Sequence, residues 1–551
     1  MSFSYQTRNR LIQDMDKTKY DLLVIGGGIT GCGIALDAVL RGLNVVLVDQ
    51  GDFAGGTSSR STKLVHGGLR YLAKGEIRLV REAGRERNAL LNIAPHLVTP
   101  MPFIIPTSRK LAGAMSYYPM TLGLRLYDHL ADVRRYERRV MLKPDQIEQA
   151  EPMLAGADMV GGGRYYEYVT DDARLTLEVA KTAHENGGHV LNYVEVVDLV
   201  ITNGRCHGAK VRDVLSGKEW EIQAETVVNA AGPWVDDIRR KDAVRPRGKR
   251  LFHSKGVHIV LDRRELPVTH AVTLLPSDGR IVFVIPRGRF TYVGTTDTSY
   301  RGDLRNPVPT QEDVAYLIDV LNEGFPKHSF NKSQVLSSWA GIRPLIHEEG
   351  KKPGEISRAD EMITSETGLI SIAGGKLTAY RKMAERVVNH VIRVLQAKGR
   401  ATRVKPCQTL TTPLTGVKGI AGTFESFKLR KRAELEQKGF QRETAERLVT
   451  TYGRHVDLVV AIHEEDDEQF HRDLLAADVR YAVWHEQALT VCDVLERRHP
   501  LFLFSHDQGR SAIEPVAKLM GDMLGWSPTR IHEEIWKAQE SVERRNKWKG
   551  E

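Results

Sequence analysis

Residues 21–31 read Asp-Leu-Leu-Val-Ile-Gly-Gly-Gly-Ile-Thr-Gly. The apolar run before the first glycine predicts a buried parallel strand, and residues 30–41 predict the helix that follows it. A second apolar run, residues 44–49, ends in Asp49. A glycine fingerprint between a strand and a helix, with an acid roughly 20 residues further on, indicates a dinucleotide-binding unit.

Each glycine of the fingerprint has its own physical role. Gly26 permits the tight turn, Gly28 lets the backbone approach a pyrophosphate, and Gly31 lets the helix pack close to the strand. The free N–H groups at the helix start would face the phosphates. Asp49 is placed to accept a hydrogen bond from a ribose hydroxyl, and its charge disfavours the 2′-phosphate of NADP. The fingerprint alone does not separate NAD from FAD.

A second glycine- and hydroxyl-rich stretch follows at residues 55–71, which read Gly-Gly-Thr-Ser-Ser-Arg-Ser-Thr-Lys-Leu-Val-His-Gly-Gly-Leu-Arg-Tyr. It resembles the FAD-contacting segment of the D-amino-acid-oxidase-like superfamily. Its second half, residues 61–71, is closer still to FAD-dependent glycerol-3-phosphate dehydrogenases. The resemblance implies FAD as the cofactor, with contacts from Thr57, Ser58, Lys63, His66 and Gly67. We expect His66 to form local hydrogen bonds rather than a covalent flavin link.

Further motifs of that family appear in the expected order at residues 227–234, 254–260, 280–297, 338–345 and 372–378. The resemblance covers residues 18–400 continuously and continues more weakly to about residue 525. It adds contacts to FAD from Ala230, Gly232, Gly374, Gly375, Lys376 and Thr378. Two glycines where a helix begins, at 374–375, would direct a positive dipole end toward the flavin.

The implied fold class is α/β. We expect a Rossmann-type FAD-binding domain with an interleaved antiparallel-sheet substrate domain, plus a C-terminal α-helical domain. The FAD-binding domain is predicted in parts, at 18–100, 226–252 and 356–400. Cap and substrate segments mixed with it are predicted at 101–225, the substrate-binding sheet at 253–355, and a linker with the helical domain at 401–551.

Removing a hydride from a secondary alcohol requires a proton acceptor and positive charge near the reacting centre. His258 is the candidate base because its pKa lies near working pH. In the alternative, His258 only hydrogen-bonds the substrate, while Lys376 or Arg343 polarises the hydroxyl. By resemblance Arg70, Tyr71 and Arg358 hold a phosphate, whose oxygens match arginine forks.

The family resemblance predicts oxidation of sn-glycerol 3-phosphate to dihydroxyacetone phosphate, with electrons passed to a quinone. One rival is a glycerol-3-phosphate oxidase that uses O2. Another is an amine, amino-acid or hydroxy-acid oxidase of the same fold. A third is a non-catalytic protein that binds a lipid or a partner and has kept the fold.

The chain has 551 residues and a formal net charge of +9. A basic surface favours anionic partners, although it also serves simple solubility. Apolar and aromatic residues at 101–106 and 111–127, beside the basic residues 134–139, suit a monotopic contact with an anionic membrane or the mouth of a quinone channel. A helical lid explains them equally well. Residues 239–250 form a second basic patch, and no motif supports nucleic-acid binding.

No apolar run is long enough to span a bilayer, so we expect a cytoplasmic protein that lies peripherally on the inner face of the cell membrane. The four cysteines are far apart and show no paired spacing. This argues against a disulfide framework or a zinc site. The acidic residues 464–468 lack the spacing of a calcium loop, so no metal is expected. The sequence does not determine whether the protein forms a homodimer.

Overall fold

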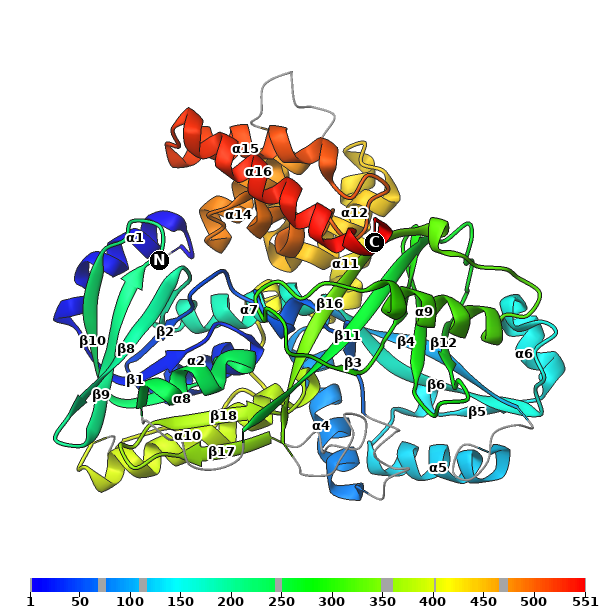
Figure 1. Cartoon of the computed structure of the whole chain (residues 1–551), viewed down its shortest axis with the longest axis horizontal. Coiled ribbons are helices and arrows are strands. Elements are labelled where there is room, and N and C mark those ends of the chain that lie inside the picture. The colour runs from blue at the N-terminus through cyan, green and yellow to red at the C-terminus, as the bar shows by residue number, and fades with distance from the viewer. Residues whose placement is uncertain are drawn as a thin grey trace.

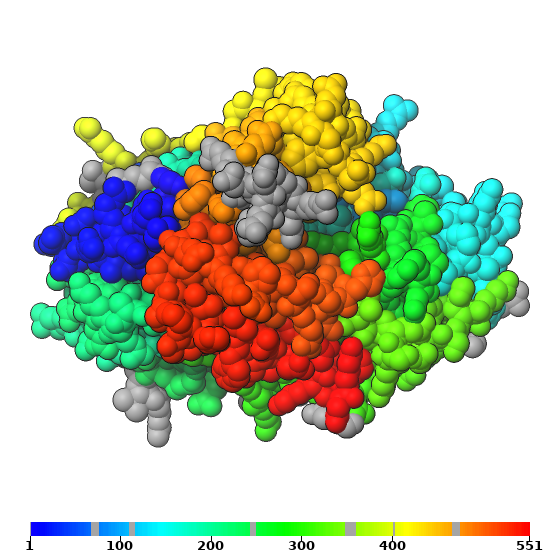
Figure 2. Space-filling model, turned by 90° about the horizontal axis from the view of Figure 1, so that it is seen from above, coloured from blue at the N-terminus to red at the C-terminus, as the bar shows by residue number. Residues whose placement is uncertain are grey.

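The computed structural model describes residues 2–67, 76–108, 116–242, 250–347, 360–400, 403–464 and 474–550. Two mixed β-sheets lie side by side, and a helical domain formed by the last part of the chain lies above them (Figure 1). Figure 2, seen from above, shows that the helical domain covers the middle of the molecule.

The first sheet has the strand order β17-β18-β10-β1-β2-β7, and β9 and β8 extend it from β10. Its strands are β1 Lys19–Ile25, β2 Val45–Val48, β7 His189–Leu191, β8 Val194–Thr202, β9 Arg205–Asp213, β10 Glu219–Asn229, β17 Asp360–Thr364 and β18 Ile370–Gly374. β1 pairs in parallel with both β2 and β10, and β10 pairs in parallel with β18. Their carboxyl ends therefore meet at one edge, where α/β sheets bind ligands.

Helices cover the faces of this sheet. The bounds of the helices in the sheet-bearing part are α1 Tyr5–Asp14, α2 Ile29–Leu40, α4 Ile77–Ile93, α5 Tyr117–Leu130, α6 Pro144–Ala150, α7 Asp172–Glu185, α8 Val235–Asp242, α9 Gln311–Gly324 and α10 Tyr380–Ala397. One hydrophobic core joins β1 and β2 to α2, α7 and α10. β1 reads as an uninterrupted apolar run at its end because helices or strands cover both of its faces.

The second sheet has the order β15-β11-β14-β13-β12-β4-β6-β3, with β16 beside β11 and β5 beside β6. Its strands are β3 Leu64–Val65, β4 Val98–Thr107, β5 Val140–Leu142, β6 Gly161–Thr170, β11 Leu251–Asp262, β12 Ala271–Leu274, β13 Val282–Arg287, β14 Phe290–Gly294, β15 Thr298–Ser299 and β16 Val335–Ile346. The hairpin expected within 280–297 is formed by β13 and β14. The domain boundaries drawn from the sequence stay predictions.

The C-terminal domain is helical. Its helices are α11 Phe424–Gln437, α12 Arg442–Tyr452, α13 Val456–Glu464, α14 Leu475–Glu486, α15 Arg510–Leu524 and α16 Pro528–Arg545. A π-helical turn, Asp493–Arg498, lies between α14 and α15. α16 begins where the Ser527 side chain accepts a hydrogen bond from the Arg530 amide and Pro528 takes the first helical position.

Neither of the two interpretations given for residues 101–106, a membrane contact or a helical lid, is right. Residues 101–106 belong to β4, which lies between β12 and β6 inside the second sheet, and Phe103, Ile104 and Ile105 are buried there. An apolar run looks the same in sequence whether protein or lipid covers it. Only the position of β4 between its neighbouring strands shows that protein covers this one. No described helix is long and apolar enough to cross a membrane. Residues 111–115 and most of the second basic patch, 243–249, lie outside the described residues.

Candidate functional site

A cavity of about 1980 Å³ lies between the two sheets and is called the central cavity here. Gly26, Asp49, Ala230 and Gly374 stand at the carboxyl ends of β1, β2, β10 and β18, and all of them line it. From the second sheet, His258 and Arg343 line the same space. The topology therefore brings the predicted cofactor segments and the predicted catalytic groups to one cavity.

The glycine fingerprint forms a cradle that no side chain can share. Gly26 has a φ of +115°, and a Cβ built on it would lie 2.5 Å from the Ala230 carbonyl oxygen. A Cβ on Gly31 would overlap the Gly26 carbonyl oxygen. Gly28 is the residue that precedes α2 and lines the cavity. Side chains are thus excluded where the turn meets the start of α2, and the contacts of Gly26, Gly28 and Gly31 with a pyrophosphate stay predictions.

Asp49 is held in place by the backbone. Its Oδ2 accepts a hydrogen bond from the Gly27 amide at 2.6 Å, and its Oδ1 accepts one from the Gly51 amide at 2.8 Å. Burial raises the pKa of Asp49 to about 6, and the hydrogen bonds from the Gly51 and Gly27 amides partly offset this rise. The carboxylate is therefore ionised at neutral pH, and each oxygen keeps a lone pair for a ribose hydroxyl.

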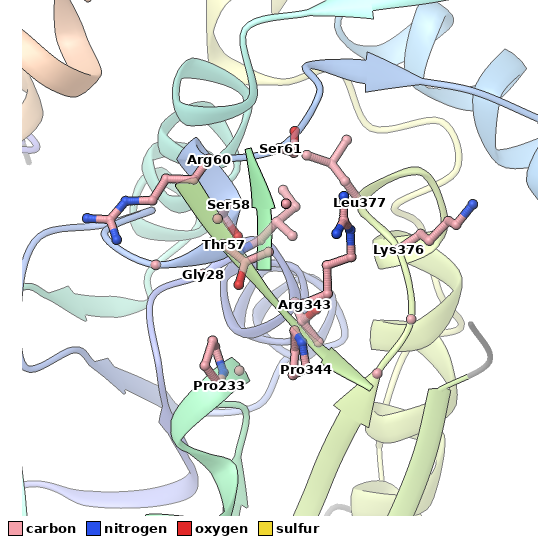
Figure 3. A pocket seen from close by; sticks show the side chains of 18 of the residues that line it. Gly28, Thr57, Ser58, Arg60, Ser61, Pro233, Arg343, Pro344, Lys376 and Leu377 are labelled. Atoms are coloured by element: carbon pink, nitrogen blue, oxygen red, sulfur yellow. Dashed lines mark hydrogen bonds between the residues drawn. The ribbon is translucent and has the colours of Figure 1, made fainter. Parts of the chain in front are cut away.

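The segment after the fingerprint closes over the start of α2. The Ser58 hydroxyl accepts a hydrogen bond from the Ile29 amide at 3.0 Å, and the Thr57 hydroxyl donates one to the Ile342 carbonyl at 2.6 Å. Figure 3 shows Gly28, Thr57 and Ser58 together on one side of the cavity. Ser58 thus satisfies one of the free amides of the helix start, and Thr57 joins the cradle to β16.

The last predicted cofactor segment differs from the expectation in one respect: α10 does not begin directly after the two glycines. Gly374 and Gly375 have φ values of +77° and +80°, which favour glycine. A short 3-10 turn, Leu377–Ala379, precedes α10, so the long helix starts later than Lys376. The Thr378 hydroxyl accepts a hydrogen bond from the His66 amide at 3.1 Å, which ties the two cofactor segments together.

Some predicted cofactor contacts fall elsewhere. Ala230, Gly232 and His66 line the central cavity, whereas Lys63, Gly67 and Gly31 do not. Lys63 is buried with its Nζ 2.5 Å from Asp172 Oδ1, and the Gly67 amide donates to Glu167 Oε2 at 3.0 Å. Lys63 and Gly67 thus hold the loop through these contacts, and their predicted contacts with the cofactor stay predictions. A flexible lysine points toward the nearest buried carboxylate, which sequence does not reveal.

His258 is buried and fixed by two contacts. Its Nε2 lies 3.0 Å from the Thr62 hydroxyl, and its ring stacks on Trp339 with the centroids 4.6 Å apart. Burial lowers the pKa of His258 well below its usual value, and the positive charges of Arg343 and Lys63 lower it further. The imidazole is therefore neutral at pH 7, but the expectation that its pKa lies near working pH is wrong, because burial and the two neighbouring cations make it a weaker proton acceptor than a free imidazole.

The Arg343 guanidinium lies over the backbone of β11. Its Nη2 donates to the Thr295 hydroxyl at 2.9 Å, and its Nη1 donates to the Thr296 carbonyl at 3.2 Å. A Cβ on Gly256 would overlap the guanidinium, so the glycine makes room for it. In Figure 3 the Lys376 side chain extends away from Arg343. The structure thus places both cations at the cavity without bringing their charged ends together.

Arg70, Tyr71 and Arg358, predicted to hold a phosphate, lie outside the described residues. Other cavity-lining residues were missed by the sequence analysis, among them Arg60, Trp234 and Glu167. Arg60 lies in the motif at 55–71 and Trp234 in the motif at 227–234, so the motifs could have identified both as cavity residues. Glu167 lies on β6 with no motif around it, and only the fold brings it to the cavity.

Comparison with known proteins identifies the family. A family model described as FAD dependent oxidoreductase matches residues 21–381, and one described as the C-terminal domain of alpha-glycerophosphate oxidase matches residues 407–531. The aerobic glycerol-3-phosphate dehydrogenase of Bacillus subtilis is 44% identical over 529 residues, which is 95% of each chain. The protein of that name from Staphylococcus haemolyticus is 42% identical over 539 residues, or 97% of this chain and 96% of the relative.

Solved structures agree with the sequence relatives. The glycerol-3-phosphate dehydrogenase from Bacillus halodurans complexed with FAD superposes with a TM-score of 0.83 at 37% identity, covering 98% of each chain. The L-alpha-glycerophosphate oxidase of Mycoplasma pneumoniae, at 17% identity and a TM-score of 0.55, shares the fold alone; it covers 72% of this chain and 98% of its own. These findings confirm the predicted resemblance, the fold class and FAD as the cofactor. The chain belongs to the FAD-dependent oxidoreductases, in the branch of the aerobic glycerol-3-phosphate dehydrogenases.

Proposed function

We propose that this protein oxidises sn-glycerol 3-phosphate to dihydroxyacetone phosphate, with the hydride accepted by FAD and the electrons then passed to a quinone. One observation carries the proposal. The cavity that contains the dinucleotide cradle is also lined by a neutral buried histidine, His258, and by an anchored guanidinium, Arg343. A bound FAD supplies the hydride acceptor.

The chain's own residues supply the proton acceptor and the positive charge. His258 is neutral, and Trp339 and Thr62 fix its ring, so a hydroxyl proton has a positioned acceptor. Arg343 stabilises negative charge that develops on the substrate oxygen, because its guanidinium is already held by Thr295 and Thr296. In the alternative role, His258 hydrogen-bonds the substrate and Arg343 or Lys376 polarises the hydroxyl. Arg70, Tyr71 and Arg358 stay our candidates for the phosphate.

The acceptor side of the proposal rests on α5. Pro119, Leu122 and Leu126 of this helix line the central cavity, and Tyr118 and Leu122 are 83% and 68% exposed. Figure 1 shows α5 below the second sheet, away from the helical domain. The cavity thus reaches a rim of exposed apolar side chains, and the arginine-rich segment 134–139 follows α5 in the chain. We propose that this rim contacts an anionic membrane on its cytoplasmic side and admits a quinone.

Anaerobic mixing of the purified yellow protein with sn-glycerol 3-phosphate tests the reaction. We expect bleaching of the flavin absorbance band, and no bleaching with amino acids or amines. Bleaching by an amino acid but not by glycerol 3-phosphate would refute the substrate.

Reoxidation tests the acceptor. We expect a soluble quinone to restore the absorbance faster than air, with little hydrogen peroxide formed. Fast peroxide production under air without quinone identifies an oxidase instead.

A further inference from the structure

The C-terminal helical domain reaches the cofactor cradle through one carboxylate. Asp52 follows Asp49 by three residues, lines the central cavity and is 3% exposed. Its Oδ2 accepts hydrogen bonds from Arg497 Nε at 2.6 Å and from Arg498 Nη1, and its Oδ1 accepts one from Arg498 Nη2 at 2.9 Å. Asn192 Nδ2 adds a bond to Oδ1 at 3.1 Å.

Both arginines are themselves held by groups of their own domain. Arg497 Nη2 lies 2.7 Å from Asp493 Oδ1, and Arg497 Nη1 lies 2.9 Å from Glu496 Oε2. Arg498 Nη2 also donates to the Glu486 carbonyl at 2.7 Å. Both side chains are buried, so these are not solvated surface charges. Buried charges are kept only when paired and hydrogen-bonded, which makes this cluster a specific contact.

The charge on Asp52 is secured by the same contact. Burial alone would raise the pKa of Asp52, but the guanidinium groups of Arg498 and Arg497 outweigh it and keep the pKa below its usual range. The charges of the helical domain also affect a second cavity-lining residue, Arg60. Burial lowers the pKa of Arg60 to about 10, and the nearby carboxylate of Glu496 opposes this shift. The C-terminal domain thus contacts this segment at Asp52, and the charge of Glu496 also acts on Arg60.

The turn that begins at Asp52 is hydrogen-bonded to the glycine fingerprint through Ala54. The Gly55 amide donates to the Asp52 carbonyl at 3.0 Å, which closes the turn at residues 52–55. Within that turn the Ala54 amide donates to the Gly27 carbonyl at 3.0 Å. A Cβ on Gly27 would lie 2.9 Å from the Phe53 ring, so the turn also packs against the fingerprint. A shift of the turn would therefore move the backbone that faces the pyrophosphate.

We infer that the C-terminal helical domain completes the FAD site, and that Arg497 and Arg498 are positioning residues that hold the 52–55 turn against the glycine fingerprint. The inference rests on FAD binding, which the family establishes, and not on the proposed substrate. If the protein did not oxidise glycerol 3-phosphate, the proposed function would fail, but this inference about FAD binding would still stand.

The test compares three variants of the full-length protein. Arg498→Met removes the bidentate contact, and Arg498→Lys keeps the charge without the fork. The control is Arg174→Met, because Arg174 Nη1 forms an equally buried bond with Glu486 Oε2 at 2.7 Å and joins α7 to the same helical domain without lining the cavity. For each variant the dissociation constant of FAD is measured by titrating the apoprotein and following flavin fluorescence, beside thermal unfolding.

We expect Arg498→Met to weaken FAD binding about tenfold to a hundredfold, Arg498→Lys to weaken it less, and Arg174→Met to leave it within about twofold. Hydrogen exchange of the amides at 52–58 should accelerate only in the Arg498 variants. Equal loss of FAD affinity in Arg174→Met and Arg498→Met would overturn the inference, since both would then act through general destabilisation. Unchanged FAD affinity in a folded Arg498 variant would overturn it as well. If Arg498→Met does not fold, the comparison of FAD affinity between Arg498→Lys and Arg174→Met tests the inference.

Discussion

At the scale of single residues, the site is built from missing side chains as much as from charged ones. Gly31 sits where a methyl group would overlap the Gly26 carbonyl, and Gly256 sits where one would overlap the Arg343 guanidinium. Cavity charges are then held by fixed partners, as Asp49 is by two backbone amides. Glycines therefore provide the space in the cavity, and hydrogen bonds fix the charged groups. Substitutions can test the two features separately.

Replacing Gly31 by alanine should abolish tight FAD binding, because the new methyl group forces the fingerprint turn away from α2. We expect FAD occupancy after purification to fall at least about tenfold, measured by the ratio of flavin to protein absorbance. Gly42→Ala at the other end of α2 is the control. Its φ of +95° brings backbone strain, but nothing lies within 4 Å of the added atom. Its FAD content should stay normal; equal losses would contradict the prediction.

The pH dependence of the reaction should report the lowered pKa of His258. Burial, Arg343 and Lys63 favour its neutral form, so the imidazole stays unprotonated well below its usual range. We expect the acidic limb of kcat/KM, which reflects the free enzyme, to lie below about pH 6.5. His258→Asn should lower kcat by about a hundredfold or more and remove this limb. A limb above pH 6.5 in the unaltered protein, or one that survives in the variant, speaks against His258 as the base.

At the scale of elements, α5 divides its residues between two environments. Met120, Leu124 and Tyr127 are buried, whereas Tyr118 and Leu122 are exposed. Tyr127 also donates to Glu167 Oε1 at 3.0 Å, which anchors the inner face of the helix beside the cavity. The exposed apolar face therefore belongs to a helix that is fixed from within, and it is available to a partner from outside.

Leu122→Ser should weaken binding to vesicles that contain anionic phospholipid. Losing one leucine from an apolar contact costs enough free energy for about a tenfold weaker association, measured by vesicle sedimentation. The control is Leu458→Ser, at a leucine 40% exposed on α13 of the helical domain. Vesicle binding that is lost equally in both variants, or in neither, would remove α5 as the membrane contact.

At the scale of the whole molecule, charged pairs join the layers. Arg8 meets Asp213 at 2.6 Å between α1 and β9, and Arg287 of β13 meets Asp171, the residue that caps α7, at 2.8 Å. Burial would raise the pKa of Asp171, but Arg287 and Lys63 lower it to about 2. The ionised form of this carboxylate therefore helps to fix the start of α7, which packs on the first sheet, against β13 of the second sheet.

Acid should weaken this junction in a defined window. Because the pKa of Asp171 in the folded protein lies below its unfolded value of about 3.9, its contribution is complete above pH 4 and is lost as the pH falls through 2. The contribution is on the order of 2 kcal/mol. Denaturant unfolding at pH 6, 4 and 2 should show a smaller loss of stability with falling pH in Asp171→Asn than in the unaltered protein. Identical pH slopes would show that Asp171 does not stabilise the junction.

Much of the cofactor site was predictable from sequence because its rules are local. A fingerprint such as residues 21–31 determines a strand, a turn and a helix within one stretch of chain, and Gly26, Gly28, Asp49 and Gly374 all line the cavity. The direction of a long side chain was not predictable. Lys63 turns to Asp172, more than 100 residues away, because a buried ammonium must pair with the nearest carboxylate.

The sequence by itself thus determined the family, the cofactor and the backbone turns that receive it, since glycine patterns act over a few residues. Only the tertiary structure decided which apolar segment is covered, β4 by its neighbouring strands, and which charges pair across the chain, such as Asp52 with Arg498. The physical reason is that burial and ion pairing depend on distances between residues far apart in the chain, and those distances exist only after the chain has folded.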